Sequence, residues 1–341
     1  MKIKKNILGQ LERVYATSIM KIDSAYNYFI ATEGQGPCLR FNEQFEPETV
    51  WDLPGGTMNI IPVPGHEGEF IATQQFFPTF DAKESRIVHA KLQDNDTWNI
   101  TPIMTIPYLH RFDILDISGE HYFIGASLCE GKTFKDDWTK PGKVYVGRLS
   151  EDLTQPFDLK PVLEGITKNH GFCHTYWNNK KTIMVTGSEG VFAIYVPEKG
   201  HMDWQVEQLL SHEVSDVAVC DIDGDGEPEL ATIEAFHGDK GIIYKKIDGM
   251  LKPIFEYPFE FGHVIWGGQI LGEPAFIIGG RKGAMELMCF KMDASGKIKG
   301  TLIDNTGGPS NIAVVNMGEQ DVILAANRQV GEMAVYTLTK S

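Results

Sequence analysis

Short apolar runs that end in small residues recur along the whole chain, and polar turns rich in Gly, Asn and Asp separate them. Seven copies, from FIATEG to ILAANR, begin at Phe29, Phe70, Phe123, Ile183, Leu230, Phe276 and Ile323. An apolar run with a tight turn precedes each copy, and two further runs follow it, the second of them more polar. Apolar runs of this length, bounded by turn residues, are typical of β-strands. The pattern predicts an all-β chain.

The spacing of the copies, 41 to 60 residues, fits four strands per repeat. Seven such repeats predict a seven-bladed β-propeller with four-stranded blades. The chain ends after a third strand, EMAVYTLTK, and its N-terminal KIKKNILGQ resembles KIKGTLIDN of the sixth repeat. We therefore expect residues near 2–9 to complete the last blade, within a single domain spanning 1–341. Two stacked β-sandwiches are the alternative, but a regular repeat that lacks its final strand favours the propeller.

Charge and cysteine content narrow the range of partners. The chain has 341 residues and a formal net charge of −15, which argues against nucleic acid or an anionic membrane as its partner. It has no apolar run long enough to span a membrane, and no apolar region follows its basic N-terminus. The five cysteines are scattered without a CxxC pair, which is typical of reduced thiols. We expect a cytoplasmic protein.

One turn has the composition of a cation loop. In DIDGDGEPE, residues 221–229, carboxylates alternate with residues that let the backbone curl. The loop resembles that of the FG-GAP or VCBS-type repeat, D-x-D-x-D-G-x-x-[DE], which occurs in propeller blades. The resemblance implies a structural calcium held by Asp221, Asp223, Asp225 and Glu229. The equivalent turns of other repeats lack these carboxylates, so the alternatives are a vestigial loop or a catalytic metal.

Histidines lie where the blades of a propeller converge. In this fold, residues just before each first strand and just after each second strand surround one central pocket. Counting six residues back from the turn in four of the repeats gives His110, Ser215, His263 and Ser310. His170 lies near the equivalent position of the fourth repeat, with His174 close behind. We expect His110, His170 and His263 to converge and to bind a divalent metal or act as a base. Ordinary packed histidines are the alternative.

Residues that follow the second strands complete the predicted pocket. Arg281 is expected to take part in catalysis and, with Arg328, to hold a carboxylate, although two surface ion pairs would explain the arginines equally well. The insertion at 129–143 is expected either to cover the pocket or to be a solvated loop. The remaining candidates for substrate binding are Glu33, Gln74, Trp138, His174, Glu189, Trp266 and Asn327.

The predicted pocket combines a base with a cation, which proton abstraction beside a carbonyl requires. In its central histidines it is similar to aldos-2-ulose dehydratase/isomerase-type propellers and to seven-bladed polysaccharide lyases, through His110, His170 and His263 alone. The resemblance implies an enzyme (lyase, dehydratase or isomerase) acting on a sugar or uronate, with a small-molecule or oligosaccharide substrate that can be anionic. The alternatives are a glycoside hydrolase on the same scaffold and a non-catalytic propeller that binds ligands or proteins.

Overall fold

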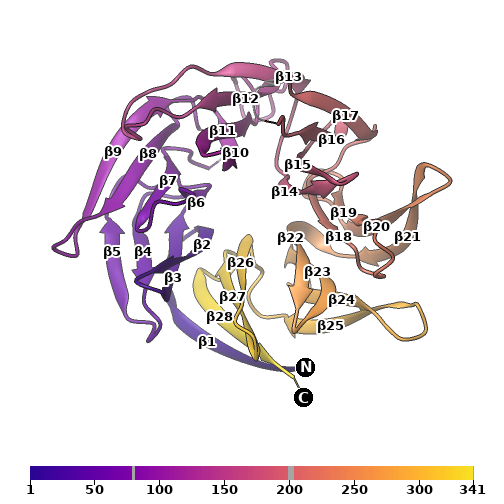
Figure 1. Cartoon of the computed structure of the whole chain (residues 1–341). Helices are drawn as coiled ribbons and strands as arrows, with labels where there is room; N and C mark the ends of the chain where they lie inside the picture. The colour runs from indigo at the N-terminus through magenta and orange to yellow at the C-terminus, as the bar shows by residue number, and fades with distance from the viewer. Residues whose placement is uncertain (79–80, 199–202, 341) are drawn as a thin grey trace. The chain divides into compact units, whose positions relative to one another are not determined.

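The computed structural model describes residues 1–78, 81–198 and 203–340. Within these residues the chain forms 28 strands and no α-helix. The strands make seven four-stranded antiparallel sheets, each built almost entirely from consecutive strands (Figure 1). The fold is therefore an all-β, seven-bladed β-propeller, as the repeats predict. Among the described residues, no helix is long and apolar enough to cross a membrane.

The sheets fall into two compact units, described here separately. The three-sheet unit comprises Leu11–Asn169 and Pro197–Asp203. Its first sheet contains β2 (Val14–Ile22), β3 (Ala25–Thr32), β4 (Cys38–Phe41) and β5 (Pro47–Trp51). Its second contains β6 (Ile60–Pro62), β7 (Glu69–Gln74), β8 (Arg86–Leu92) and β9 (Trp98–Thr105). Its third contains β10 (Leu109–Ile117), β11 (Glu120–Ser127), β12 (Gly142–Arg148) and β13 (Lys160–Ile166).

The four-sheet unit comprises Met1–Gln10, His170–Val196 and Trp204–Ser341. Its first sheet contains β14 (Phe172–Trp177), β15 (Lys180–Gly187), β16 (Gly190–Tyr195) and β17 (Gln205–Leu210). Its second contains β18 (Asp216–Cys220), β19 (Glu229–Glu234), β20 (Lys240–Ile247) and β21 (Met250–Pro258). Its third contains β22 (Glu260–Ile270), β23 (Glu273–Lys282), β24 (Leu287–Met292) and β25 (Ile298–Asp304). Its fourth contains β26 (Asn311–Asn316), β27 (Gln320–Asn327), β28 (Glu332–Thr339) and β1 (Lys2–Gln10).

The last sheet joins the two ends of the chain. β1 pairs antiparallel with β28, from Lys2 opposite Thr339 to Gln10 opposite Glu332 (Figure 1). Lys5 of β1 adds ion pairs to Asp304 and Glu332, at 3.4 and 2.7 Å. The N-terminal strand thus supplies the missing outer strand of the seventh blade, which confirms the prediction for residues near 2–9.

A β-bulge opens several first strands and determines where their side chains point. His263 is the extra residue of β22, because Gly262 and Val264 face the consecutive residues Gly280 and Gly279 of β23. His110 is the extra residue of β10 in the same way. A bulge bends the strand and re-aims one side chain. Both histidines are turned inward by it, and their exposed fractions are 2% and 3%.

Candidate functional site

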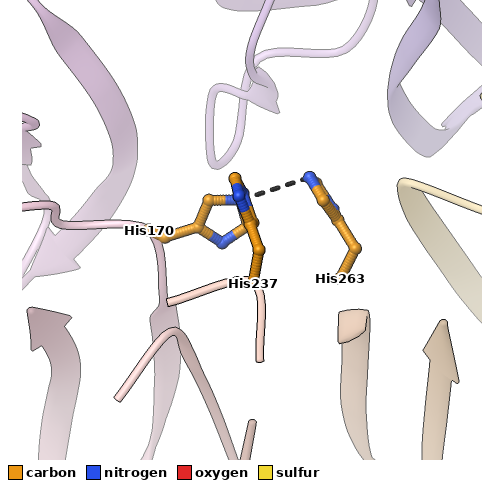
Figure 2. A group of neighbouring side chains, drawn as sticks. All are labelled: His170, His237 and His263. Atoms are coloured by element: carbon orange, nitrogen blue, oxygen red, sulfur yellow. Dashed lines mark hydrogen bonds between the residues drawn. The ribbon is translucent and has the colours of Figure 1, made fainter. Parts of the chain in front are cut away.

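Three histidines meet within the four-sheet unit (Figure 2). His170 lies just before β14, His237 lies in the connection after β19, and His263 is the bulge residue of β22. Each offers one ring nitrogen, and these three nitrogens lie within 4.8 Å of one another. The structure therefore brings together two of the histidines expected from the sequence, His170 and His263, with a third that the sequence interpretation overlooked.

The closest contact joins the Nε2 atoms of His170 and His263, 3.3 Å apart, and Figure 2 shows it as a dashed line. The two rings are nearly perpendicular, with centroids 4.6 Å apart. Zinc–imidazole bonds are about 2.0–2.1 Å long, so two nitrogens on one tetrahedral ion lie about 3.3 Å apart. The observed separation equals that expected of two ligands of a single ion.

Acceptor groups lie at the other ring nitrogen of both histidines. The Nδ1–H of His263 donates to the backbone carbonyl of Ser310, at 2.7 Å. Nδ1 of His170 lies 3.5 Å from a carboxylate oxygen of Asp216, whose other oxygen accepts the N–H of Val217. The Ser310 carbonyl keeps the proton of His263 on Nδ1 and leaves its Nε2 with a lone pair. This lone pair faces Nε2 of His170, which either donates a hydrogen bond to it or binds a metal ion together with it.

The backbone around His170 leaves room for this carboxylate only because Gly171 has no side chain. A Cβ at Gly171 would lie 2.5 Å from Oγ1 of Thr186 and 2.7 Å from Cα of Asp216. The Gly171 N–H in turn donates to Thr186 Oγ1, at 2.9 Å. The sequence His-Gly at 170–171 therefore places the imidazole directly over Asp216.

His237 completes the group from a left-handed backbone conformation, with φ of 49°. Its N–H donates to Oγ of Ser215, and its ring stacks on His263, with centroids 5.2 Å apart and planes inclined by 13°. Burial lowers the pKa of His237 well below its ordinary value, and the neighbouring His170 and two cations, Arg281 and Lys282, lower it further. The ring is therefore neutral at neutral pH, with a nitrogen lone pair free to bind a metal.

Phe261 connects the histidines to a pair of cations. Its ring stacks on His237, with centroids 4.5 Å apart and planes 20° from parallel. The Arg281 guanidinium carbon and the Lys282 ammonium each lie 4.9 Å from the centre of the Phe261 ring. Two positive charges thus border one side of the histidine group.

The candidates of the three-sheet unit lie in varied settings. His110 packs against Phe76, with ring centroids 5.4 Å apart. Gln74 is buried and accepts a hydrogen bond from Arg86. Glu33 is partly buried beyond β3, and the ring of Trp138 is covered by the Lys132 ammonium, 3.1 Å from its centroid. None of these four belongs to the group of three histidines.

The other candidates of the four-sheet unit are hydrogen-bonded within a blade, packed on the core, or exposed. Asn327 is fully buried, and its side-chain nitrogen donates to Glu332 and to the Tyr336 hydroxyl. Trp266 packs on the core of its sheet, and His174 is exposed on β14. The last two are partly buried: Glu189 in the β15–β16 turn, and Arg328, which follows Asn327. Asn327 therefore has its amide nitrogen engaged within its own blade.

A cation of the protein itself, the ammonium of Lys245 on β20, lies against the acidic loop of the β18–β19 turn. The Lys245 ammonium contacts Asp223 and lies 2.6 Å from Asp225 and 3.0 Å from Glu229. Burial alone would lower the pKa of Lys245, but these three carboxylates outweigh it and raise that pKa. Asp221 instead accepts the backbone N–H groups of Gly224, Asp225 and Gly226. Lys245 thus lies among the carboxylates predicted to hold a calcium ion.

Both overlooked residues have a sequence signal that becomes readable once the blades are aligned. His237 lies three residues after the second strand of its blade, where the chain should return to the pocket, in the segment EAFHGD. Lys245 follows Tyr244, and Tyr244 pairs with Leu230 across the hairpin, so Lys245 faces the end of the acidic loop. The sequence interpretation stopped at Glu234 in this blade, and for the acidic turn it considered only the loop itself.

Neither a protein-family model nor a curated protein sequence matches the chain. Solved structures do match over nearly the whole length. The β-propeller domain of Cps50 (Swd1) from Myceliophteria thermophila is 7% identical, with a TM-score of 0.63 over 99% of this chain and 100% of that one. A streptogramin B lyase is 12% identical, with a TM-score of 0.62 over 98% and 97%. The soluble aldose sugar dehydrogenase from Escherichia coli is 12% identical, with a TM-score of 0.52 over 98% and 99%. These similarities support the fold alone, and the FG-GAP/VCBS resemblance stays a prediction.

Proposed function

We propose that this chain is a metal-dependent, carbohydrate-active enzyme, a lyase, dehydratase or isomerase, whose metal is held by His170, His237 and His263. One observation carries the proposal: the Nε2 atoms of His170 and His263 face each other at 3.3 Å while an acceptor lies at each Nδ1. Metal-ligating histidines have this arrangement, with an outer acceptor that orients the ring. With His237, these residues place three imidazole nitrogens within 4.8 Å of one another, which suits a shared metal ion.

The donor set favours a transition metal. Three imidazole nitrogens suit zinc, copper, iron or nickel, whereas calcium prefers oxygen ligands. Three protein ligands also leave a position of the ion open, as in catalytic rather than structural sites. When bound there, the ion would polarise a substrate carbonyl or carboxylate oxygen and stabilise negative charge as a neighbouring proton leaves.

The rest of the site keeps the ligands ready. Asp216 and the Ser310 carbonyl orient the rings of His170 and His263, so these rings need no reorganisation when the ion binds. His237 is kept neutral by burial and by the charges around it, which makes its lone pair available. The catalytic roles expected for His110 and Arg281, and the other expected substrate contacts, stay predictions from the sequence. The choice of a sugar follows the sequence resemblance and is compatible with the sugar dehydrogenases among the similar folds.

Metal analysis of the purified protein, combined with a screen of keto-sugars and uronates, tests the proposal. We expect one equivalent of a transition metal per chain, and turnover visible as new absorbance from an enone or enol ether. Substitution of His170 or His263 by Ala should remove both metal and turnover. His66→Ala is the matched control, because His66 is a partly exposed histidine of another blade.

Two results would contradict the proposal. The first is a protein that takes up no transition metal when zinc, manganese, iron or nickel is supplied in excess. The second is full metal content and full turnover in all three single variants, His170→Ala, His237→Ala and His263→Ala. A protein without metal or turnover that still binds sugars would instead be a non-catalytic ligand-binding propeller.

A further inference from the structure

Two adjacent cations lie close to one aromatic ring at the border of the histidine group. The charged groups of Arg281 and Lys282 each lie 4.9 Å from the centroid of Phe261. That ring stacks on His237 and lies nearly parallel to His263, with centroids 6.3 Å apart. The two cations and two of the proposed metal ligands therefore lie around the same aromatic ring.

The chain adopts unusual backbone geometry to make this arrangement. Phe261 has a φ of 58°, in the left-handed region that a bulky side chain adopts only at a cost, and it precedes the bulge at His263. On the partner strand, Gly283 turns the chain directly after Lys282, with φ of 60°. The bulge and the turn together place the end of β23 over Phe261.

The charge of this corner differs from that of the protein as a whole. The chain has a formal net charge of −15, so two neighbouring cations are a local exception. One carboxylate also belongs to this corner: Glu260 lies opposite Lys282 in the ladder, and its Oε1 lies 2.2 Å from where a Cβ at Gly283 would be. Lys282 is exposed and Arg281 is partly exposed.

We infer that Arg281 and Lys282 bind the carboxylate of the substrate, so that the enzyme acts on sugar acids in preference to neutral sugars. This inference rests on the proposed function and adds the substrate class to it. A guanidinium holds a carboxylate through two parallel hydrogen bonds, and an adjacent ammonium adds a point charge. Phe261 beside the cations offers an apolar face to the sugar ring.

The assignment differs from the pair expected from the sequence, Arg281 with Arg328. Arg328 occupies the position of Arg281 in the next repeat, but the ring contacts that define this corner involve Lys282. The two interpretations predict different outcomes for single substitutions. Lys282→Met should weaken binding of a sugar acid if the structural pair is correct, and Arg328→Met should do so if the sequence pair is correct.

Calorimetric titration of the metal-loaded protein with galacturonate and with galactose tests the inference. We expect the wild-type protein to prefer the acid by at least about tenfold, with a preference that shrinks as salt is added. Arg281→Met and Lys282→Met should each lower the affinity for galacturonate by about tenfold relative to the affinity for galactose. Lys299→Met, an exposed lysine on the outer strand β25 of the same blade, should change none of these quantities.

Equal affinity for the acid and the neutral sugar would overturn the inference, as would a loss that follows Arg328→Met and not Lys282→Met. Metal content and turnover, measured on the same samples, separate this failure from failure of the proposed function. A protein with metal and turnover but no preference for acids refutes the proposed carboxylate-binding site alone. A protein that prefers acids through Arg281 and Lys282 but holds no metal refutes the proposed function alone.

Discussion

The four-sheet unit contains two groups of side chains that could hold a metal. They differ in whether the protein itself places a cation among the donor atoms. Around His170 and His263, the protein places oxygen atoms near both Nδ1 atoms and turns the two Nε2 atoms toward each other. Around Asp223, Asp225 and Glu229, the protein inserts its own cation, the ammonium of Lys245. The histidine group therefore contains no cation of the protein between its facing nitrogens, whereas the acidic loop is neutralised in part by Lys245.

The difference shows that ligand count is a poor guide to a metal site. The acidic loop offers more oxygen atoms and matches a cation-loop motif, yet three of its carboxylates already contact Lys245. The histidine group has no sequence motif, because its members come from three blades. What distinguishes a site that needs a metal is donors whose charge or lone pairs the protein leaves uncompensated.

The largest effect is expected at the ligands themselves. His263→Ala or His170→Ala should abolish stoichiometric metal binding, because either change removes one of the two nitrogens that lie 3.3 Å apart. Elemental analysis of protein purified with added zinc measures the result. The affinity should fall by more than the about 10–100-fold typical of outer partners.

His110→Ala is the matched comparison, because His110 occupies the equivalent bulge of a blade in the three-sheet unit. We expect this variant to keep its metal and to lose some stability, since a buried ring against Phe76 is removed. Loss of metal in His110→Ala together with retention in His237→Ala would favour the group of three expected from the sequence.

The next effect concerns the acceptor outside the group. Asp216→Asn should weaken metal binding by about 10–100-fold without removing a ligand, because the amide orients the His170 ring less strongly than a carboxylate does. Gly171→Ala should act in the same direction, since its Cβ would lie 2.7 Å from Cα of Asp216. Competition with a fluorescent zinc chelator gives both affinities. If both variants bound zinc as tightly as the wild type, Asp216 would have no part in orienting His170.

A smaller effect, on folding, is expected at the acidic loop. Burial raises the pKa of Glu229, whose side chain is fully buried and has Lys245 as its ion-pair partner. Lys245→Gln should therefore lower the free energy of unfolding by about 1–3 kcal/mol, because a buried charge loses its partner. Calcium should restore the loss in the variant and change the wild type little. Thermal unfolding with calcium or with chelator checks both parts, and a wild type stabilised as strongly as the variant would show that calcium displaces Lys245.

The repeats made the fold predictable, but they made only part of the site predictable. Strand order and blade number follow from the apolar periodicity that recurs in every copy, and the closing strand β1 follows from the fourth strand that the last copy lacks. His170 and His263 follow because they sit at repeated positions. His237 does not, because it lies in a connection whose left-handed backbone is specific to one blade. Lys245 is missed for a similar reason: its contact depends on the register of β19 with β20, which a motif within the loop does not contain.

The smallest effect is a difference in pH dependence between the two groups in metal-free protein. The pKa of His237 is lowered in the folded state, by burial and then by His170 and the two cations, so the unfolded chain binds more protons than the folded one below its ordinary pKa of about 6.5. The stability contributed by neutral His237 is therefore complete above about pH 6.5 and falls as the pH drops below it, by up to about 1.4 kcal/mol per pH unit.

Asp225 behaves as a carboxylate paired with Lys245, which lowers its pKa, so its contribution is lost only as the pH falls below about 4. Urea unfolding between pH 8 and 4.5 in the presence of EDTA should show a shallower slope for His237→Asn than for the wild type, since Asn tolerates the left-handed backbone. Asp225→Asn should leave that slope unchanged, and equal slopes for wild type and His237→Asn would mean that His237 is not held neutral by the fold.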